Sequence, residues 1–177
     1  MVRMASRVAV CVSAVSLSLV APVSAQEALT WVDLRGDRSE SCASLFEMWE
    51  NEPDCAKLTA LARLLPDKLR ACAPGDADLD GAVVSIAGFV HPLEFEFKGV
   101  QDFLLIPRLR QDCRHPPTPL PDQVILVRYD AGVDVSADPV RVEGVLGVQF
   151  SETDNANAAY ILEATEVEAA FLPDVVD

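Results

Sequence analysis

The spacing of apolar residues changes its period once along this chain, just before its middle. Over residues 39–72, apolar side chains recur three and four positions apart, the pattern of one buried face of an α-helix. Pro66 is placed to begin a last short helix in its first turn. Met48 and Trp49 lie on the apolar stripe, and we interpret them as packing residues. We therefore predict a short α-helical segment within residues 26–80.

Beyond residue 81, apolar and polar side chains alternate with a period of two, which is typical of strands with one buried face. Turn residues such as Gly99 and Gly132 separate the strand-like runs. Five short strands favour a mainly β fold. We predict a small five-stranded OB-like barrel over residues 81–170. A small sandwich with the same strands is the alternative, because one sequence does not give strand order. The predicted strands are residues 83–89, 103–106, 124–129, 140–148 and 160–167.

Three glycines fall inside these strand patterns, namely Gly88, Gly144 and Gly147. A glycine within a strand contributes no side chain to packing, and it commonly marks a bulge or a tight bend. We interpret all three residues as bends of the kind that closes a barrel.

The first 25 residues have the organisation of a secretory signal peptide. Two arginines precede a short apolar run at residues 8–20, and small residues at 23–25 suit cleavage before Gln26. The run is shorter than the roughly 20 residues that a spanning helix needs, so an uncleaved anchor is the less favoured alternative. We expect an exported, periplasmic protein without stable membrane insertion. The predicted organisation is a signal peptide at 1–25, a helical segment with cysteines at 26–80, a β-barrel domain at 81–170 and a C-terminal tail at 171–177.

The charge of the chain narrows the range of its partners. The 177 residues include 14 basic and 28 acidic side chains, with a net charge of −14, and loss of the two arginines in residues 1–25 would make the mature chain more negative still. Such a surface repels phosphate backbones and anionic lipid head groups. We therefore expect no nucleic acid partner. Solubility alone explains the acidity, although cationic partners such as metal ions would also be favoured.

Four cysteines follow the predicted signal peptide: Cys42, Cys55, Cys72 and Cys113. An even number of cysteines in an exported chain favours disulfides, because the periplasm is oxidising. Three pairings of the four are possible, and the sequence does not choose among them. If all four pair, Cys113 is a structural cysteine; otherwise it can remain a free thiol.

The most distinctive motif is Cys113-x-His115, which is followed by four prolines within six residues. Side chains two residues apart point to the same side of an extended chain, and prolines keep a chain extended. A thiolate and a neutral imidazole both suit zinc or copper. The only other histidine is His91, at the end of the first predicted strand. The candidate metal site is therefore Cys113, His115 and His91, with an oxygen ligand from Glu94, Asp112 or Asp122; ordinary surface positions for both histidines are the alternative.

The sequence contains no recognisable catalytic constellation. It has neither a Gly-x-Ser-x-Gly elbow nor a glycine-rich phosphate loop, and it has no Cys-x-x-Cys or zinc-protease histidine motif. Cys113 and His115 are too close along the chain to meet readily as nucleophile and base. We therefore expect a protein that is not an enzyme.

The proline segment also carries a resemblance to a known family. Cys113-x-His115, followed by prolines and then Gln123, resembles an uncharacterised family of exported bacterial proteins, the domain of unknown function 3299 (DUF3299). The resemblance covers about residues 82–168. Further matching stretches are residues 84–94, 102–107, 139–144 and 160–164, with Trp31 and Leu34 as a weaker Trp-x-x-Leu opening.

The resemblance implies no particular activity, because the family has none established. It implies an accessory role in the periplasm or envelope, since members are envelope-associated and some accompany ABC-type transport systems. The preferred hypothesis is a protein-interaction module that docks on an envelope protein, with an ABC-type transporter component as the candidate partner. Extended prolines suit docking because they lose little conformational entropy on binding.

The alternative hypothesis is a periplasmic zinc- or copper-binding protein that uses the Cys-x-His proline loop. The state of Cys113 separates the two hypotheses. A free thiol supports the metal site, and a disulfide supports the docking module.

Overall fold

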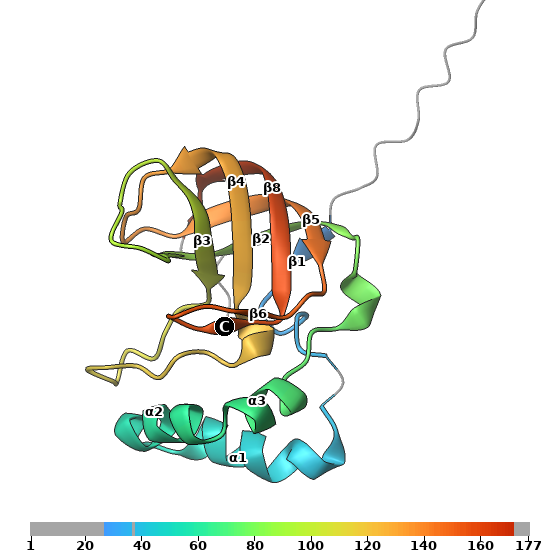
Figure 1. The fold of residues 1–177 in the computed structure, drawn as a ribbon, viewed down its shortest axis with the longest axis vertical. Coiled ribbons are helices and arrows are strands. Elements are labelled where there is room, and N and C mark those ends of the chain that lie inside the picture. The colour runs from blue at the N-terminus through green and yellow to red at the C-terminus, as the bar shows by residue number, and fades with distance from the viewer. Residues whose placement is uncertain (1–26, 37, 172–177) are drawn as a thin grey trace, which may run out of the picture.

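The computed structural model describes residues 27–36 and 38–171 of the chain. A β-barrel forms one part of the molecule, and three short helices lie together below one of its ends (Figure 1). The predicted signal peptide, and all but the first residue of the predicted C-terminal tail, lie outside the described residues. No helix in the described part of the chain is long and apolar enough to span a membrane.

The barrel is built from five strands that close on themselves. Hydrogen-bonded neighbours follow the order β2, β3, β4, β8, β5, and β5 pairs again with β2. The β4 and β8 strands are parallel and the other barrel neighbours are antiparallel, which is the connectivity of an OB fold. The predicted mainly β, OB-like barrel is thus confirmed, and the alternative of a sandwich is wrong. The strands are β2 (Val83–Pro92), β3 (Val100–Ile106), β4 (Ile125–Val133), β5 (Val140–Gly147) and β8 (Tyr160–Ala169).

Closure of the barrel depends on a change of partner within β2 at Gly88. Residues 83–88 of β2 pair with β5, and the next residues, 89–92, pair with β3. A Cβ atom at Gly88 would lie 2.8 Å from the carbonyl oxygen of Ile106 and 2.8 Å from Cζ2 of Trp31. The strand can therefore bend across both neighbours only because this residue lacks a side chain.

The other two glycines differ from each other. The pairing of β5 with β8 shifts register between Glu143 and Gly144, where a Cβ at Gly144 would overlap the carbonyl oxygen of Glu163. This is the predicted bulge. At Gly147 the pairing is regular, and the nearest atom to an added Cβ would be 3.7 Å away. The interpretation of Gly147 as a bend is therefore wrong.

Residues 103–106 of the strand β3 are buried on both faces. Phe103 and Leu105 point into the barrel core, whereas Leu104 and Ile106 belong to a separate apolar cluster on the outer face. Phe89, Leu93, Val124, Leu126 and Ile161 belong to the same cluster, and two segments outside the barrel strands complete it. They are the hairpin of β6 (Ser151–Glu152) and β7 (Asn157–Ala158), and residues 107–120, which we call the proline strap. Ligands of OB folds commonly bind this outer face, and here the chain itself covers it.

The helical layer has a small core of its own. Pro66 occupies the first turn of the last helix, as predicted, and the Asp54 side chain caps the middle helix by accepting hydrogen bonds from two backbone N–H groups. Leu120 of the proline strap packs into this core with residues from the helices. The elements are η1 (Glu40–Cys42), α1 (Ala43–Asn51), α2 (Cys55–Leu64), α3 (Pro66–Cys72) and η2 (Ala77–Leu79).

The residues before the helices belong to the barrel. The β1 strand (Glu27–Leu29) pairs in parallel with β2, and Trp31 and Leu34 are buried in the barrel core. The predicted segment 26–80 is therefore helical only from Glu40 onward, and its described residues before that belong to the barrel or lead from it. Tyr160 holds this start in place, because its hydroxyl donates to the Leu34 carbonyl at 2.6 Å and accepts from the backbone N–H of Asp76 at 2.6 Å.

Glycine substitutions test the closure of the barrel. Gly88→Ala and Gly144→Ala should each lower the free energy of unfolding by more than about 1 kcal/mol, because the new Cβ would meet backbone atoms that cannot move independently. Gly147→Ala is the matched control and should leave stability within about 0.5 kcal/mol, since its Cβ has room. Urea unfolding measures all three variants. Equal effects at the three positions would contradict the closure argument.

Candidate functional site

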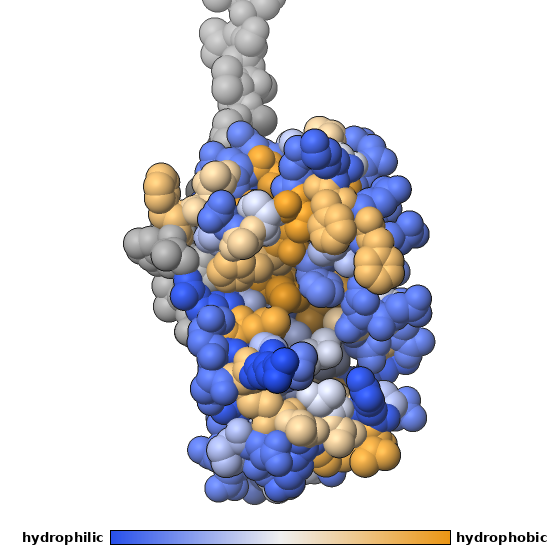
Figure 2. Space-filling view, turned by 90° about the vertical axis from the view of Figure 1, so that its left-hand side faces the viewer, coloured by the Kyte–Doolittle hydropathy of each residue, from blue (hydrophilic) through white to orange (hydrophobic). Residues whose placement is uncertain are grey.

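A cleft separates the helical layer from the proline strap, with a cavity of about 430 Å³. Trp49 and Leu58 line it from the helices, and Leu109 and Leu120 line it from the strap. Figure 2 views the side of the molecule on which the strap lies, where strongly hydrophilic and apolar side chains adjoin between the barrel and the helical layer. The cleft therefore combines polar and apolar walls, which is typical of a recognition site.

Four arginines line this cleft. Arg35 and Arg38 follow the first strand, and Arg108 and Arg110 begin the proline strap. The only carboxylate among the described lining residues is that of Glu50. We call this the arginine cleft. It gathers four arginines at one place on a chain whose net charge is −14, and carboxylates that pair with two of them offset part of their charge. An anionic group would be attracted to the positive charge that remains.

Two of the four arginines are held by internal partners, and Arg38 is the more buried of these. Its Nη2 lies 3.2 Å from Oδ2 of Asp122, and its Nη1 lies 3.5 Å from Oε1 of Glu50. The guanidinium carbon also lies 3.9 Å from the centroid of the Phe46 ring. Asp122 is fully buried, and burial raises the pKa of its carboxyl group although Arg38 opposes the rise.

Arg110 attaches the proline strap to the helical layer. Its Nη1 donates to the carbonyl oxygen of Glu52 at 2.8 Å, in the turn between α1 and α2. Its Nη2 and Nε contact the carboxylate of Asp112 at 2.8 and 3.2 Å. The hydrogen bonds from Arg110 lower the pKa of Asp112. Arg110 is therefore mainly a structural residue of the cleft wall.

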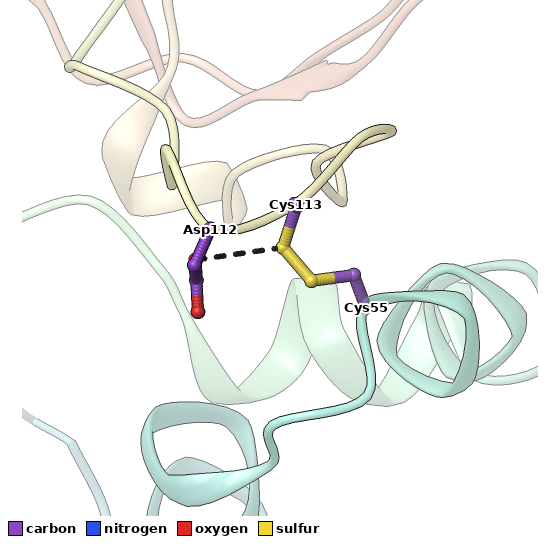
Figure 3. Close-up of side chains that lie close together, drawn as sticks. All are labelled: Cys55, Asp112 and Cys113. Carbon is purple, nitrogen blue, oxygen red and sulfur yellow. Dashed lines mark hydrogen bonds between the residues drawn. A yellow bond between two sulfur atoms is a disulfide. The ribbon is translucent and has the colours of Figure 1, made fainter.

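A disulfide attaches the strap to the same turn. Cys55, the first residue of α2, is bonded to Cys113, with Asp112 beside the bond (Figure 3). The second disulfide joins Cys42 to Cys72 within the helical layer. Both sulfurs of the strap disulfide belong to partly exposed residues, whereas Cys42 and Cys72 are 5% and 4% exposed. All four cysteines pair, so Cys113 is a structural cysteine.

The three predicted metal ligands are not assembled. The Cys113 sulfur is in a disulfide, and a metal ligand would need the thiolate. Of the described residues, a single group of three His, Cys, Asp or Glu side chains brings ligand atoms close together, and it contains Cys55, Asp112 and Cys113 but neither histidine. His115 is exposed. The structure therefore does not bring Cys113, His115 and His91 together as a ligand set, and the candidate metal site stays a prediction.

One part of that prediction has a structural counterpart. His91 reaches the proline strap, because it lines a cavity of about 140 Å³ together with Pro116, Pro117, Thr118 and Pro119. The cavity lies between the outer face of β3 and the strap, since Leu104 and Ile106 also line it. The end of β2 thus meets the strap without forming a ligand set.

The arginine cleft was not among the predicted sites. Trp49, interpreted as a packing residue, does pack against the helical core, but it also lines the cleft. The sequence does contain a signal for this site, because arginines cluster in two short stretches, 35–38 and 108–114, of a strongly acidic chain. Only the fold shows that Arg35, Arg38, Arg108 and Arg110 of these stretches line one cleft.

The comparisons with known proteins concern the family and the fold. A family model described as "Protein of unknown function (DUF3299)" matches residues 31–169. The crystal structure of a DUF3299 family protein (PA4066) from Pseudomonas aeruginosa PAO1, at 2.45 Å resolution, is similar, with 26% sequence identity and a TM-score of 0.58. That match covers 84% of this chain and 98% of the other. A search of curated proteins found no related chain.

The attachment of the strap can be tested by its cleavage. Mild dithiol treatment should reduce the partly exposed Cys55–Cys113 bond before the buried Cys42–Cys72 bond, and trypsin should then cut faster after Arg108, Arg110 or Arg114. Mass spectrometry follows both steps. The double variant Cys55→Ser with Cys113→Ser should show the same cleavage without reductant. A strap that resists trypsin in this variant would show that packing alone holds it.

The burial of Asp122 predicts how the free energy of unfolding depends on pH. Because the folded-state pKa of Asp122 is raised above 3.8, the ionised form lowers stability above that raised pKa, and the effect disappears as pH falls below 3.8. Asp122→Asn should therefore increase the free energy of unfolding at pH 7, and the gain should vanish at low pH. Urea unfolding from pH 7 to pH 3 measures this.

Asp33 is the control of opposite sign. The hydroxyl and the backbone N–H of Thr30 donate hydrogen bonds to the Asp33 carboxylate, and they lower its pKa below 3.8. The ionised Asp33 therefore stabilises the fold above pH 3.8, and this stabilisation is lost as pH falls through the lowered pKa. Asp33→Asn should reduce stability at pH 7. A loss of stability at pH 7 in Asp122→Asn as well would mean that attraction to Arg38 outweighs the cost of burial.

Proposed function

Starting from the fact that the chain belongs to the DUF3299 family, we propose that it is an exported accessory protein of the cell envelope that docks a partner protein in its arginine cleft. The observation that carries this proposal is the arginine cleft itself, a cavity of about 430 Å³ where four arginines meet Trp49 and the strap. Positive charge concentrated in a cleft of an acidic protein supplies electrostatic complementarity, which governs partner choice and association rate.

The covered outer face of the barrel supports this location. Leu104 and Ile106 of β3 are buried beneath the hairpin and the strap, so the surface that OB folds commonly use is occupied. The cleft lies where the strap crosses from the barrel to the helices. The proline strap thereby forms one wall of the proposed docking site.

Two features support export. Residues 1–25 have the organisation of a signal peptide, and all four cysteines after them are paired. Disulfides persist in oxidising compartments such as the periplasm. The candidate partner is an envelope protein, and the family resemblance makes a component of an ABC-type transport system the first one to test.

The competing functions have less support. A zinc or copper protein that uses Cys113 would need the disulfide to be reduced first. A binding role rather than catalysis is supported by the chemistry of the cleft, which provides guanidinium groups and flat apolar side chains. Such groups recognise and hold a ligand.

Crosslinking in intact cells tests the proposal. A photoreactive amino acid at Thr118, an exposed residue on the cleft wall, should yield a protein adduct, and the same probe at exposed Asp138, in the loop between β4 and β5, should not. The double variant Arg35→Glu with Arg108→Glu should abolish the adduct while leaving circular dichroism unchanged. Intact mass of the periplasmic protein should show a chain that begins near Gln26.

Three outcomes would contradict it. Adducts of equal yield from Thr118 and Asp138 would mean that the protein meets its neighbours by random contact and not by docking at the cleft. An adduct that survives charge reversal would remove the arginines from the interface. Full-length protein retained in the membrane would refute export.

A further inference from the structure

The arginine cleft continues past the proline strap into a second cavity. This cavity has a volume of about 270 Å³ and shares Trp49, Thr118 and Pro119 with the first one. Its far side is polar and is lined by Arg63 and by Thr153, Asp154, Asn155 and Asn157 of the β6–β7 hairpin. The two cavities therefore adjoin at Trp49 and the strap, and we call the pair the trough. Four arginines line one cavity, and Arg63, Asp154 and two asparagines are among the residues that line the other.

We propose that this trough binds an extended peptide segment of the partner, with acidic side chains against Arg35 and Arg108 and an apolar side chain beside Trp49. The inference rests on the proposed docking function and specifies its ligand. Two adjoining hollows suit an elongated ligand better than a compact one. At the far end, the Asn157 amide has both a donor and an acceptor for an extended peptide backbone, and the Asn155 side chain has its acceptor oxygen, since its N–H groups donate to the Pro92 and Leu93 carbonyls.

The arginines divide into two pairs by their internal contacts. Arg38 is held by Asp122 and Glu50, and Arg110 by Asp112 and the Glu52 carbonyl. Both are fixed parts of the wall. Their internal contacts leave them less available to a ligand.

The other pair is less engaged. Arg108 has a ring contact with Phe89 at 5.9 Å and no carboxylate within 4.0 Å among the described residues, and Arg35 has one partner, Glu50, at 4.0 Å. Arg35 and Arg108 are therefore the pair that can bind the carboxylates of a ligand by donating hydrogen bonds to them. Carboxylate and guanidinium match as a planar, bidentate pair.

The surrounding charge limits how acidic the segment can be. The chain as a whole carries −14, so a long polyanion would extend beyond the arginines into a repulsive field. A short acidic segment with neutral flanks keeps its charge inside the cleft. This favours a peptide with about two acidic residues over nucleic acid or a polyacidic tail.

The test uses synthetic peptides and the full mature protein. The probe is a peptide with blocked ends that carries one glutamate on each side of a leucine, with neutral serine and asparagine flanks. In the two control peptides, both glutamates are replaced by glutamines or by lysines. Binding can be followed by the fluorescence of Trp49, because Trp31 is the second of the two tryptophans and is only 2% exposed in the barrel core. Trp49→Phe should remove the signal.

The glutamate peptide should bind and the lysine peptide should not. Arg35→Gln and Arg108→Gln should each weaken binding on the order of tenfold, and added salt should weaken it further. Arg114→Gln is the matched control, because Arg114 is an exposed arginine of the same strap and does not line either cavity. It should change the dissociation constant less than about twofold.

Several results would overturn the inference. Equal binding of the glutamate and glutamine peptides would exclude recognition of carboxylates, and equal losses from Arg114→Gln and Arg108→Gln would exclude the cleft. Competition by glutarate or inorganic phosphate as strong as that by the peptide would make the ligand a compact anion. If no peptide binds while crosslinking at Thr118 still depends on Arg35 and Arg108, the peptide inference fails and the docking function stands.

Discussion

The barrel closes because β2 leaves one partner strand and joins another at Gly88, directly against Trp31. This close approach has consequences on both sides of the barrel wall. The Trp31 indole N–H donates to the Ala87 carbonyl at 2.8 Å, and the Trp31 carbonyl accepts from Gln123 Nε2 at 2.8 Å. One tryptophan thus connects the bend in β2 to η3 (Pro121–Gln123), where the proline strap ends. The arginines just after Trp31 take their position from the same anchor.

The proposed docking site lies where the barrel meets segments that are held at few points. The strap contacts the helical layer through the Cys55–Cys113 bond, the hydrogen bond from Arg110 to Glu52 and the packing of Leu120. Prolines supply no backbone N–H, so such a segment cannot be fixed by a regular hydrogen-bond ladder. Cavities on several sides of Thr118 and Pro119 follow from this sparse attachment. A wall of this kind can adjust to a ligand while the barrel stays fixed.

Local sequence patterns predicted the helices and strands, but they did not predict the contacts between segments that lie far apart in the sequence. Alternation and short strand length identified all five barrel strands, and Gly88 and Gly144 mark real close approaches. The apolar run 103–106 departs from the predicted alternation with one buried face, because the hairpin and the strap also cover the outer face of β3. Arg35 and Arg108 share a cleft only because β1 joins the barrel beside β2. Such a meeting depends on strand order, and the cysteine pairing depends on how the helices and the strap pack, so neither can be read from a local period.

The interleaving of the two disulfides constrains how the chain can mature. Cys55 lies between Cys42 and Cys72 in sequence, yet its partner is Cys113, 58 residues further on. If the chain crosses the inner membrane N-terminus first, three cysteines reach the oxidising side before the fourth. Joining cysteines in order of emergence would pair Cys42 with Cys55 and leave Cys72 for Cys113. The native pairing therefore requires either that Cys42 stays reduced until the helical segment brings it to Cys72 or that a disulfide isomerase corrects the first bond.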